Sequence, residues 1–301
     1  MAADGRQVER ALAGTALDGA PVRELQVPGE ASVAVAVAVD LGSGLKSDAI
    51  LAAWRVLRER VGELGRWPVV MSSWSGEALT DDALAAWSVP PSALAAQARE
   101  LSPAEALARF GADDAWWWEH DWRGWVEQRL GATRHRFGDA PDAREILDRA
   151  QKPTLAELDA WLLAWEEARW PTAEPDAGWH LEWFDDLSGD ELAVVLLPTP
   201  DPADAGVYVS YFGAESEGAA VGLAALLRSW HERHGAELVA SWGTMLQFVV
   251  AWPPQTLDEA FALAVEQDRV AGSLLGPAGV ELRDHARALL RRETWFLHDR
   301  P

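Results

Sequence analysis

Hydrophobic positions between residues 206 and 254 predict the best-defined run of secondary structure in the chain. Residues 206–212 alternate larger apolar or aromatic side chains with small ones, which is typical of a strand. The next apolar residues recur at helical spacing and form one stripe: Val221, Leu223, Leu226, Leu227 and Trp230. Two short apolar segments, 236–240 and 245–252, then predict strands joined by a tight turn at Gly243. With the helix that follows them, the predicted order is β-α-β-β-α.

Residues that begin and end elements support these boundaries. Gly235 follows the predicted helix at the place where a left-handed residue is expected to close it. Pro253 and Pro254 cannot continue a strand ladder, so the second strand ends before them. Thr256 and Glu259 have the spacing of a capping box, which opens the next helix.

The N-terminal part has a similar layout. Residues 4–30 predict a short helix and then an irregular approach, and residues 31–40 alternate valine with alanine, which predicts a strand buried on both faces. A glycine-containing turn leads into a helix whose apolar stripe includes Trp54 and Leu57, and a strand follows at 69–71. The identity between the two β-α-β segments is too small to decide whether they arose by duplication.

Residues 77–170 are helical in pattern and rich in tryptophan. Capping boxes at Ser102/Glu105 and Thr154/Glu157 open two helices, and another is predicted over 113–130, ending at Gly131. Prolines, glycines and aspartates make 171–190 the best candidate for a linker. A strand at 192–197, a helix after a break at 272–277, and a last strand at 294–298 complete the chain.

These elements predict an α+β fold with two sheet-bearing lobes, β-α-β and β-β-α-β-β-α-α-β, and a tryptophan-rich helical insertion. The predicted domains are an N-terminal α/β lobe at 1–76, the helical insertion at 77–170, and a C-terminal α+β domain at 191–301.

Composition narrows the classes of partner. Acidic residues outnumber basic ones, 48 to 26, for a formal net charge of −22. This charge repels nucleic acids and anionic membranes and permits a basic protein partner, although solubility alone also explains it. The chain has no cysteine, which excludes disulfides, thiolate metal sites and cysteine nucleophiles. Neither a signal-peptide core nor an apolar run of about 18 residues is visible, so we expect a cytoplasmic protein.

Several segments together resemble a bacterial family of domains of unknown function, the one numbered four-two-five-three. They are the Gly-Arg-Trp-Pro element at 65–68, SWHERHGAELV at 229–239, Pro253-Pro254 with Thr256 and Ala260, Ala264 with Glu266, and WFLHD at 295–299. The strongest part covers about the last third of the chain. The resemblance implies an α+β domain with no established activity.

The sequence departs from that family at two loops. The family usually has a Trp-Gly-Gly-like loop with an asparagine, where this chain has Phe212-Gly213-Ala214-Glu215. It also tends to carry a cysteine and an aspartate after the glutamate that corresponds to Glu266, and the cysteine is missing here. Since ligands gather beyond the carboxyl ends of strands, Phe212, Gly213, Glu215 and Glu266 are the candidate ligand pocket, altered from that of the family.

Asp40-Leu41-Gly42-Ser43-Gly44 is the segment most similar to an enzyme motif. It follows a predicted strand and resembles the first motif of S-adenosylmethionine methyltransferases, which makes Asp40, Gly42 and Gly44 candidate cofactor-binding residues. Lys46 stands where a third glycine is expected, and no acidic residue ends the next strand. Lys46-Ser47 also resembles the end of a P-loop, but Leu45 replaces its last glycine. An ordinary glycine turn is the alternative.

Two other motifs have both a functional and a structural interpretation. His231 and His234 are spaced i, i+3, so they could share a metal-ligand face, yet the motif is one residue short of a zincin. Favourable interaction with the helix dipole explains them better. Trp116, Trp117 and Trp118 point about 100° apart on a helix, which favours a helix buried on all sides between two lobes. If one were exposed, it would be a partner-binding surface.

No complete catalytic constellation is present, and no G-x-S-x-G nucleophile motif occurs. The predicted function is a non-catalytic cytoplasmic protein-interaction or regulatory module, without a cofactor. The alternative is a cofactor-dependent enzyme, methyltransferase-like or nucleotide-binding, acting at residues 40–47.

Overall fold

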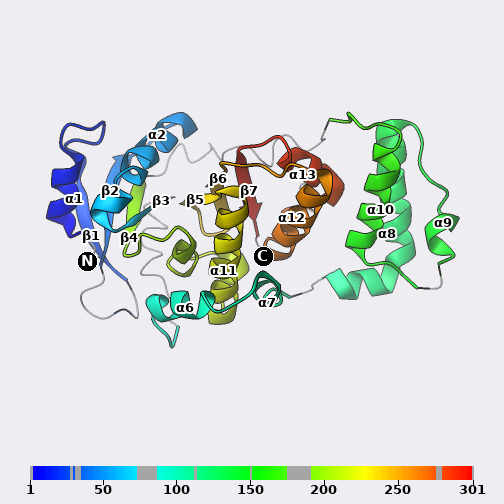
Figure 1. The fold of residues 1–301 in the computed structure, drawn as a ribbon, viewed down its shortest axis with the longest axis horizontal. Coiled ribbons are helices and arrows are strands. Elements are labelled where there is room, and N and C mark those ends of the chain that lie inside the picture. Colours follow the sequence, from blue (N-terminus) through cyan, green and yellow to red (C-terminus); the bar gives the residue numbers. More distant parts are fainter. Residues whose placement is uncertain are drawn as a thin grey trace. The chain divides into compact units, whose positions relative to one another are not determined.

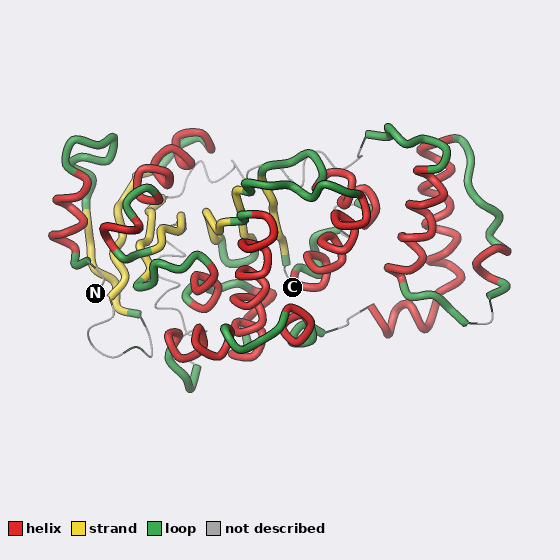
Figure 2. The backbone as a smooth tube through the Cα atoms, in the orientation of Figure 1, coloured by secondary structure: helices red, strands yellow, loops and turns green. Residues whose placement is uncertain are grey.

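The computed structural model describes residues 3–27, 30, 35–72, 87–111, 114–149, 151–174, 191–275 and 280–299, and of residues 114–120 the backbone alone. The chain forms two compact units, each discontinuous in sequence. Figures 1 and 2 show the helices and strands of the chain. The sheet unit contains Met1–Phe110, Leu181–Trp252 and Glu293–Pro301, and the helical unit contains Gly111–His180 and Pro253–Arg292. The helical unit thus joins part of the predicted insertion to helices of the predicted C-terminal domain. The domain boundaries at 76, 170 and 191 stay a prediction.

The sheet unit is built on one seven-stranded sheet, in the order β1-β2-β4-β3-β5-β6-β7. The strands are β1 (Val22–Gln26), β2 (Val35–Gly42), β3 (Trp67–Ser72), β4 (Leu192–Leu197), β5 (Glu237–Ser241), β6 (Met245–Val249) and β7 (Thr294–His298). Neighbours are antiparallel except β3 and β5, which are parallel. The α+β class is confirmed. The strands assigned to two lobes share one sheet because β4 of the predicted C-terminal lobe lies between β2 and β3 of the N-terminal lobe, and β3 also pairs with β5.

The sheet unit also contains helices, which are interspersed with these strands along the chain. They are α1 (Gly5–Leu12), α2 (Ser47–Arg58), α3 (Val61–Leu64), α6 (Pro91–Ala98), α7 (Pro103–Leu107) and α11 (Glu217–His234). Gly235 closes α11 with φ 59°, and Gly243 takes φ 80° in the β5–β6 turn, as predicted. The Ser102/Glu105 capping box is also confirmed.

The helices α2 and α11 cover opposite faces of the sheet. Glu237 bonds to Arg58 of α2, whereas Leu238 pairs with Phe248, whose ring lies 6.2 Å from that of Trp230 in α11. Successive strand residues point to opposite faces, so the central strands are buried on both sides. This explains why β3 and β4 are buried along their whole length.

Two sequence predictions for the sheet unit are wrong. Residues 206–212 do not form a strand: they run from the end of the 3-10 turn η2 (Ala203–Val207) to the start of the 3-10 turn η3 (Phe212–Ala214), and Tyr211 between them bridges to Gly243. A Cβ on Gly206 would lie 3.1 Å from the Ala224 backbone, so this segment is held against α11 by a residue with no side chain. The irregular approach in residues 4–30 contains β1, whose pairing with β2 is a long-range contact.

The Gly-Arg-Trp-Pro element fixes the start of β3. Arg66 is buried and donates to three backbone carbonyls, those of Ala3 at 2.6 Å, Val35 at 2.7 Å and Leu196 at 3.3 Å. The neighbouring Trp67 donates its indole N–H to the Leu238 carbonyl at 3.2 Å. Burial lowers the pKa of Arg66, although Glu24 and Asp4 oppose this effect. The element therefore ties the N-terminus, β2, β4 and β5 together.

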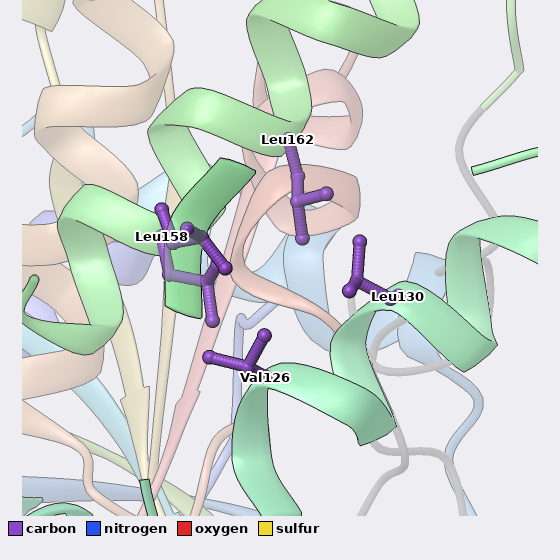
Figure 3. Close-up of a cluster of buried hydrophobic side chains, with 5 residues drawn as sticks. Val126, Leu130, Leu158 and Leu162 are labelled. Carbon is purple, nitrogen blue, oxygen red and sulfur yellow. The ribbon is translucent and has the colours of Figure 1, made fainter. Parts of the chain in front are cut away.

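The helical unit contains α8 (Asp114–Phe137), α9 (Arg144–Leu147), α10 (Leu155–Glu167), α12 (Leu257–Val270) and α13 (Leu282–Leu289). Val126, Leu130, Ile146, Leu158 and Leu162 form a core among α8, α9 and α10 (Figure 3). The Thr154/Glu157 capping box is confirmed, and Thr256 caps α12.

The predicted helix over 113–130 is longer than expected and is interrupted. It continues through Gly131 to Phe137, and Asp121 has non-helical φ −138° and ψ 43°. Its carboxylate accepts a hydrogen bond from the Gly124 N–H at 3.3 Å, so it acts as a second helix start inside α8. No helix within the described residues is long and apolar enough to cross a membrane.

Candidate functional site

A hollow of about 280 Å³ lies in the sheet unit where α11 ends and β5 begins. It is lined by His231, Gly235, Glu237 and the chain from Val249 to Trp252. Among the described residues, Trp252 is the only large hydrophobic side chain that is exposed, with 62% of its surface accessible. The backbone N–H groups of Trp252 and Ala251 donate to the His234 carbonyl at 2.9 and 3.1 Å, so the backbone that carries the indole is fixed.

An ion pair lies beside this hollow. Arg58 donates Nε and Nη2 to the two carboxylate oxygens of Glu237 at 2.9 and 2.5 Å. Its guanidinium carbon lies 4.7 Å from the centroid of the Trp67 ring, an arrangement that is typical of a cation–π contact. The hydrogen bonds to Glu237 raise the pKa of Arg58 against the effect of burial. The hollow thus combines an apolar wall with a carboxylate that already binds a guanidinium.

The two histidines contact backbone carbonyls beyond the end of α11. Nδ1 of His231 lies 3.1 Å from the Ala236 oxygen, and Nδ1 of His234 lies 3.2 Å from the Trp252 oxygen. His234 is buried, and its ring meets Trp295 edge to face at 5.5 Å. The metal-ligand role of His231 and His234 stays a prediction. In the parts of the chain that are described, no three His, Cys, Asp or Glu residues are grouped to hold a metal ion.

The methyltransferase-like turn lies at the end of β2. Gly42 and Gly44 have φ 84° and 74°, so the turn needs glycine at both positions. Asp40 pairs with Arg23 at 3.1 Å, and both side chains are more than one-third exposed. The pairing partners of β2 are both antiparallel, unlike the parallel sheet of a nucleotide-binding fold. A cofactor role for Asp40, Gly42 and Gly44 stays a prediction.

The residues of the predicted ligand pocket fall in both units. Phe212, Gly213 and Glu215 lie in the sheet unit at η3, and Glu266 lies on α12 in the helical unit. A shared pocket among them stays a prediction. Near η3, the Glu215 carbonyl accepts the Trp87 indole N–H at 3.2 Å, which joins this loop to the segment before α6.

Trp116, Trp117 and Trp118 lie on the backbone of α8, and their side chains fall outside the described part of the structure. Their predicted role as a partner-binding surface stays a prediction. The exposed tryptophan that the structure does describe, Trp252, was assigned by its sequence pattern to a strand. In the structure β6 ends at Val249, before Trp252. The sequence signal for its exposure is its position directly before Pro253-Pro254, which cannot continue a strand.

A second polar centre, around Asp204, lies between η2, α6 and α11. The Asp204 carboxylate accepts hydrogen bonds from Thr199 Oγ1 at 3.0 Å and from Arg99, and Arg228 lies 3.7 Å away. Asp204 is buried, and Arg228 also donates to the Ala98 carbonyl at 3.0 Å. Burial and the nearby Asp201 raise the pKa of Asp204, although Thr199 and the two arginines lower it. The geometry fastens η2 to both helices.

We expect this centre to make the stability of the sheet unit depend on pH. Because the folded pKa of Asp204 is raised, its contribution to stability is present below the ordinary aspartate value of about 3.9 and is lost as pH rises through the folded value. We expect the free energy of unfolding of the native protein, relative to Asp204→Asn, to fall as pH rises through that window and to be flat above it. Urea denaturation at a series of pH values measures the difference. If the free energy of unfolding of the native protein relative to Asp204→Asn rose with pH instead, the two arginines would outweigh burial in setting the pKa of Asp204.

The comparison with protein families agrees with the resemblance seen in the sequence. Residues 193–299 match the model of a family described as a domain of unknown function, DUF4253. No curated protein and no solved structure matches the chain. The matched segment is the last third of the chain, as predicted, and it includes Asp204, Trp252 and helices of both units. Asp40 and the Trp116–Trp118 run lie outside it.

Proposed function

We propose that the protein is a non-catalytic interaction module of the cytoplasm, and that it binds a basic segment of a partner protein at the Trp252 hollow. The observation that carries this proposal is the 62% exposure of Trp252 beside a hollow on a fixed backbone. Exposed tryptophans on rigid supports are the residues that most often dominate binding energy at protein interfaces.

The chemistry of the hollow favours a lysine or arginine as the anchoring side chain. The aliphatic stem would contact Val249, Val250 and Gly235, while the cation lies over the Trp252 ring. Arg58 already stacks on Trp67 and binds Glu237 in this way next to the hollow, so the same recognition operates within the chain. The net charge of −22 attracts a basic partner over longer range.

Fluorescence anisotropy with a labelled oligo-arginine peptide tests the proposal. Trp252→Ala is expected to weaken binding about 2-fold to 30-fold, which corresponds to the roughly 0.5–2 kcal/mol of a cation–π contact. Trp252→Phe keeps an aromatic face and is expected to retain most of the affinity. Binding is also expected to weaken as salt is raised.

The controls separate this surface from general charge attraction. An oligo-glutamate peptide should not bind. Trp170→Ala removes a tryptophan in the helical unit, where its ring stacks on Phe137 at 4.5 Å, and should leave the affinity for oligo-arginine unchanged. Equal affinity of the native protein and Trp252→Ala for oligo-arginine would reject the hollow as the binding surface. Binding of S-adenosylmethionine that is lost in Gly44→Val would instead support the enzyme alternative.

A further inference from the structure

In the helical unit, charged side chains join α13 to α8 and α10. Ion pairs connect Arg129 with Glu281, Arg136 with Asp284, Arg283 with Asp159 and Glu166, and Arg287 with Glu166 and Glu167. Each of these pairs has one partner in the α8–α10 segment and the other in residues 281–287. Most are largely buried, so their geometry is constrained by the helices that carry them.

Arg283 occupies the centre of this arrangement. Its side chain is 2% exposed and donates to Asp159 Oδ1 at 2.5 Å and to Glu166 Oε1 at 2.9 Å. It also donates to Thr133 Oγ1 at 3.2 Å and to the Arg129 carbonyl at 3.4 Å. All three nitrogens of the guanidinium thus have acceptors on α8 or α10, and Asp159, Glu166 and Thr133 are fully buried.

The acceptors are all carried by α8 and α10, although Arg287 of α13 also lies 2.9 Å from Glu166. Asp159 and Glu166 lie seven residues apart on α10, and Arg129 and Thr133 lie four apart on α8, so each pair shares one helix face. The two helices meet through their own apolar core, which includes Val126, Leu130, Leu158 and Leu162 (Figure 3). The pocket for Arg283 is therefore built mainly from α8 and α10, with Glu281 as a further acceptor at 3.3 Å.

We infer that α8 and α10 form a guanidinium-recognition site, and that Arg283 of α13 is its intramolecular ligand. Two carboxylates, a hydroxyl and a carbonyl approach the fork from different directions, which matches the planar set of donors of a guanidinium. An ammonium group is a point charge and cannot reach all four acceptors at once. The inference does not depend on the Trp252 hollow, which lies in the other unit.

Chemical rescue of the Arg283→Ala variant tests the site. The substitution empties the site, while the pairs of Arg129, Arg136 and Arg287 still hold α13 in place. N-ethylguanidinium at ten times its dissociation constant is expected to raise the ratio of folded to unfolded helical unit about elevenfold. Hydrogen exchange in peptides from α8, α10 and α13 measures this ratio. If the variant is unfolded without the compound, the same ratio is read as refolding when the compound is added.

Two controls make the outcome specific. Ethylammonium at the same concentration should give little rescue, and Arg144→Ala, which removes an arginine that is 80% exposed, should respond to neither compound. Adding Thr133→Val to the Arg283→Ala variant should weaken the rescue, because it removes one acceptor while keeping the volume. Equal rescue by the two compounds, or an equal response of Arg144→Ala, would overturn the inference.

Discussion

Arg283→Ala is expected to lower the free energy of unfolding of the helical unit by about 3–5 kcal/mol, because it leaves buried carboxylates without their partner. Asp159 and Glu166 have 0% and 1% of their side-chain surface exposed, so bulk water solvates these carboxylates poorly in place of the guanidinium. Burial by itself would lower the pKa of Arg283, yet Asp159, Glu166 and Asp284 outweigh it and raise the pKa. Arg129, 3.7 Å from Asp159, and Arg287, 2.9 Å from Glu166, offset part of the loss and favour the lower end of the range.

The measurement has to resolve the two units, because a chain with two units need not unfold in one step. Hydrogen exchange followed by mass spectrometry does so peptide by peptide. The matched control is Arg144→Ala, whose ion pair with Asp142 is exposed and is worth about 1 kcal/mol or less. If both variants lost the same small amount of protection in α8 and α10, the ion-pair network would not hold the unit together.

Trp230→Ala is expected to lower the free energy of unfolding of the sheet unit by about 3–5 kcal/mol, the usual range for removing a buried tryptophan. Trp230 is fully buried, and its ring meets Phe248 and Trp295 edge to face, each with centroids 6.2 Å apart. These contacts join α11 to β6 and β7, so the cavity would open between the helix and the sheet. Trp230→Phe keeps part of the ring contact and should lose less.

Urea denaturation, with hydrogen exchange in α11 and β6 as the local measure, tests this effect. Trp252→Ala is the control, since it removes the same side chain from an exposed position and should change stability by only about 0.5 kcal/mol. A similar loss in the two variants would mean that Trp230 is not the centre of the core. Unchanged protection in α11 after Trp230→Ala would have the same meaning.

Local patterns in the sequence determined much of the fold. The α+β class, the helix ends at Ser102, Thr154 and Gly235, and the strands β4 and β7 could be predicted because each depends on residues close together in the chain. The sequence also contained the family resemblance over the last third, which the match at 193–299 confirms. Both kinds of signal are carried by order along the chain and need no distant partner.

Only the tertiary structure decided which distant residues meet. The single sheet follows from the insertion of β4 between β2 and β3 and from the pairing of Val70 with Ala240, all between residues far apart in sequence. The segment around Gly206 packs so closely on α11 that a Cβ at Gly206 would lie 3.1 Å from the Ala224 backbone, and this packing overrides an alternation that locally favours a strand. The same holds for Trp252 and Arg283: composition shows a tryptophan and an arginine, but exposure of the one and burial of the other among carboxylates are set by packing. Burial and charge pairing depend on what surrounds a residue in space, and a sequence records only what lies beside it along the chain.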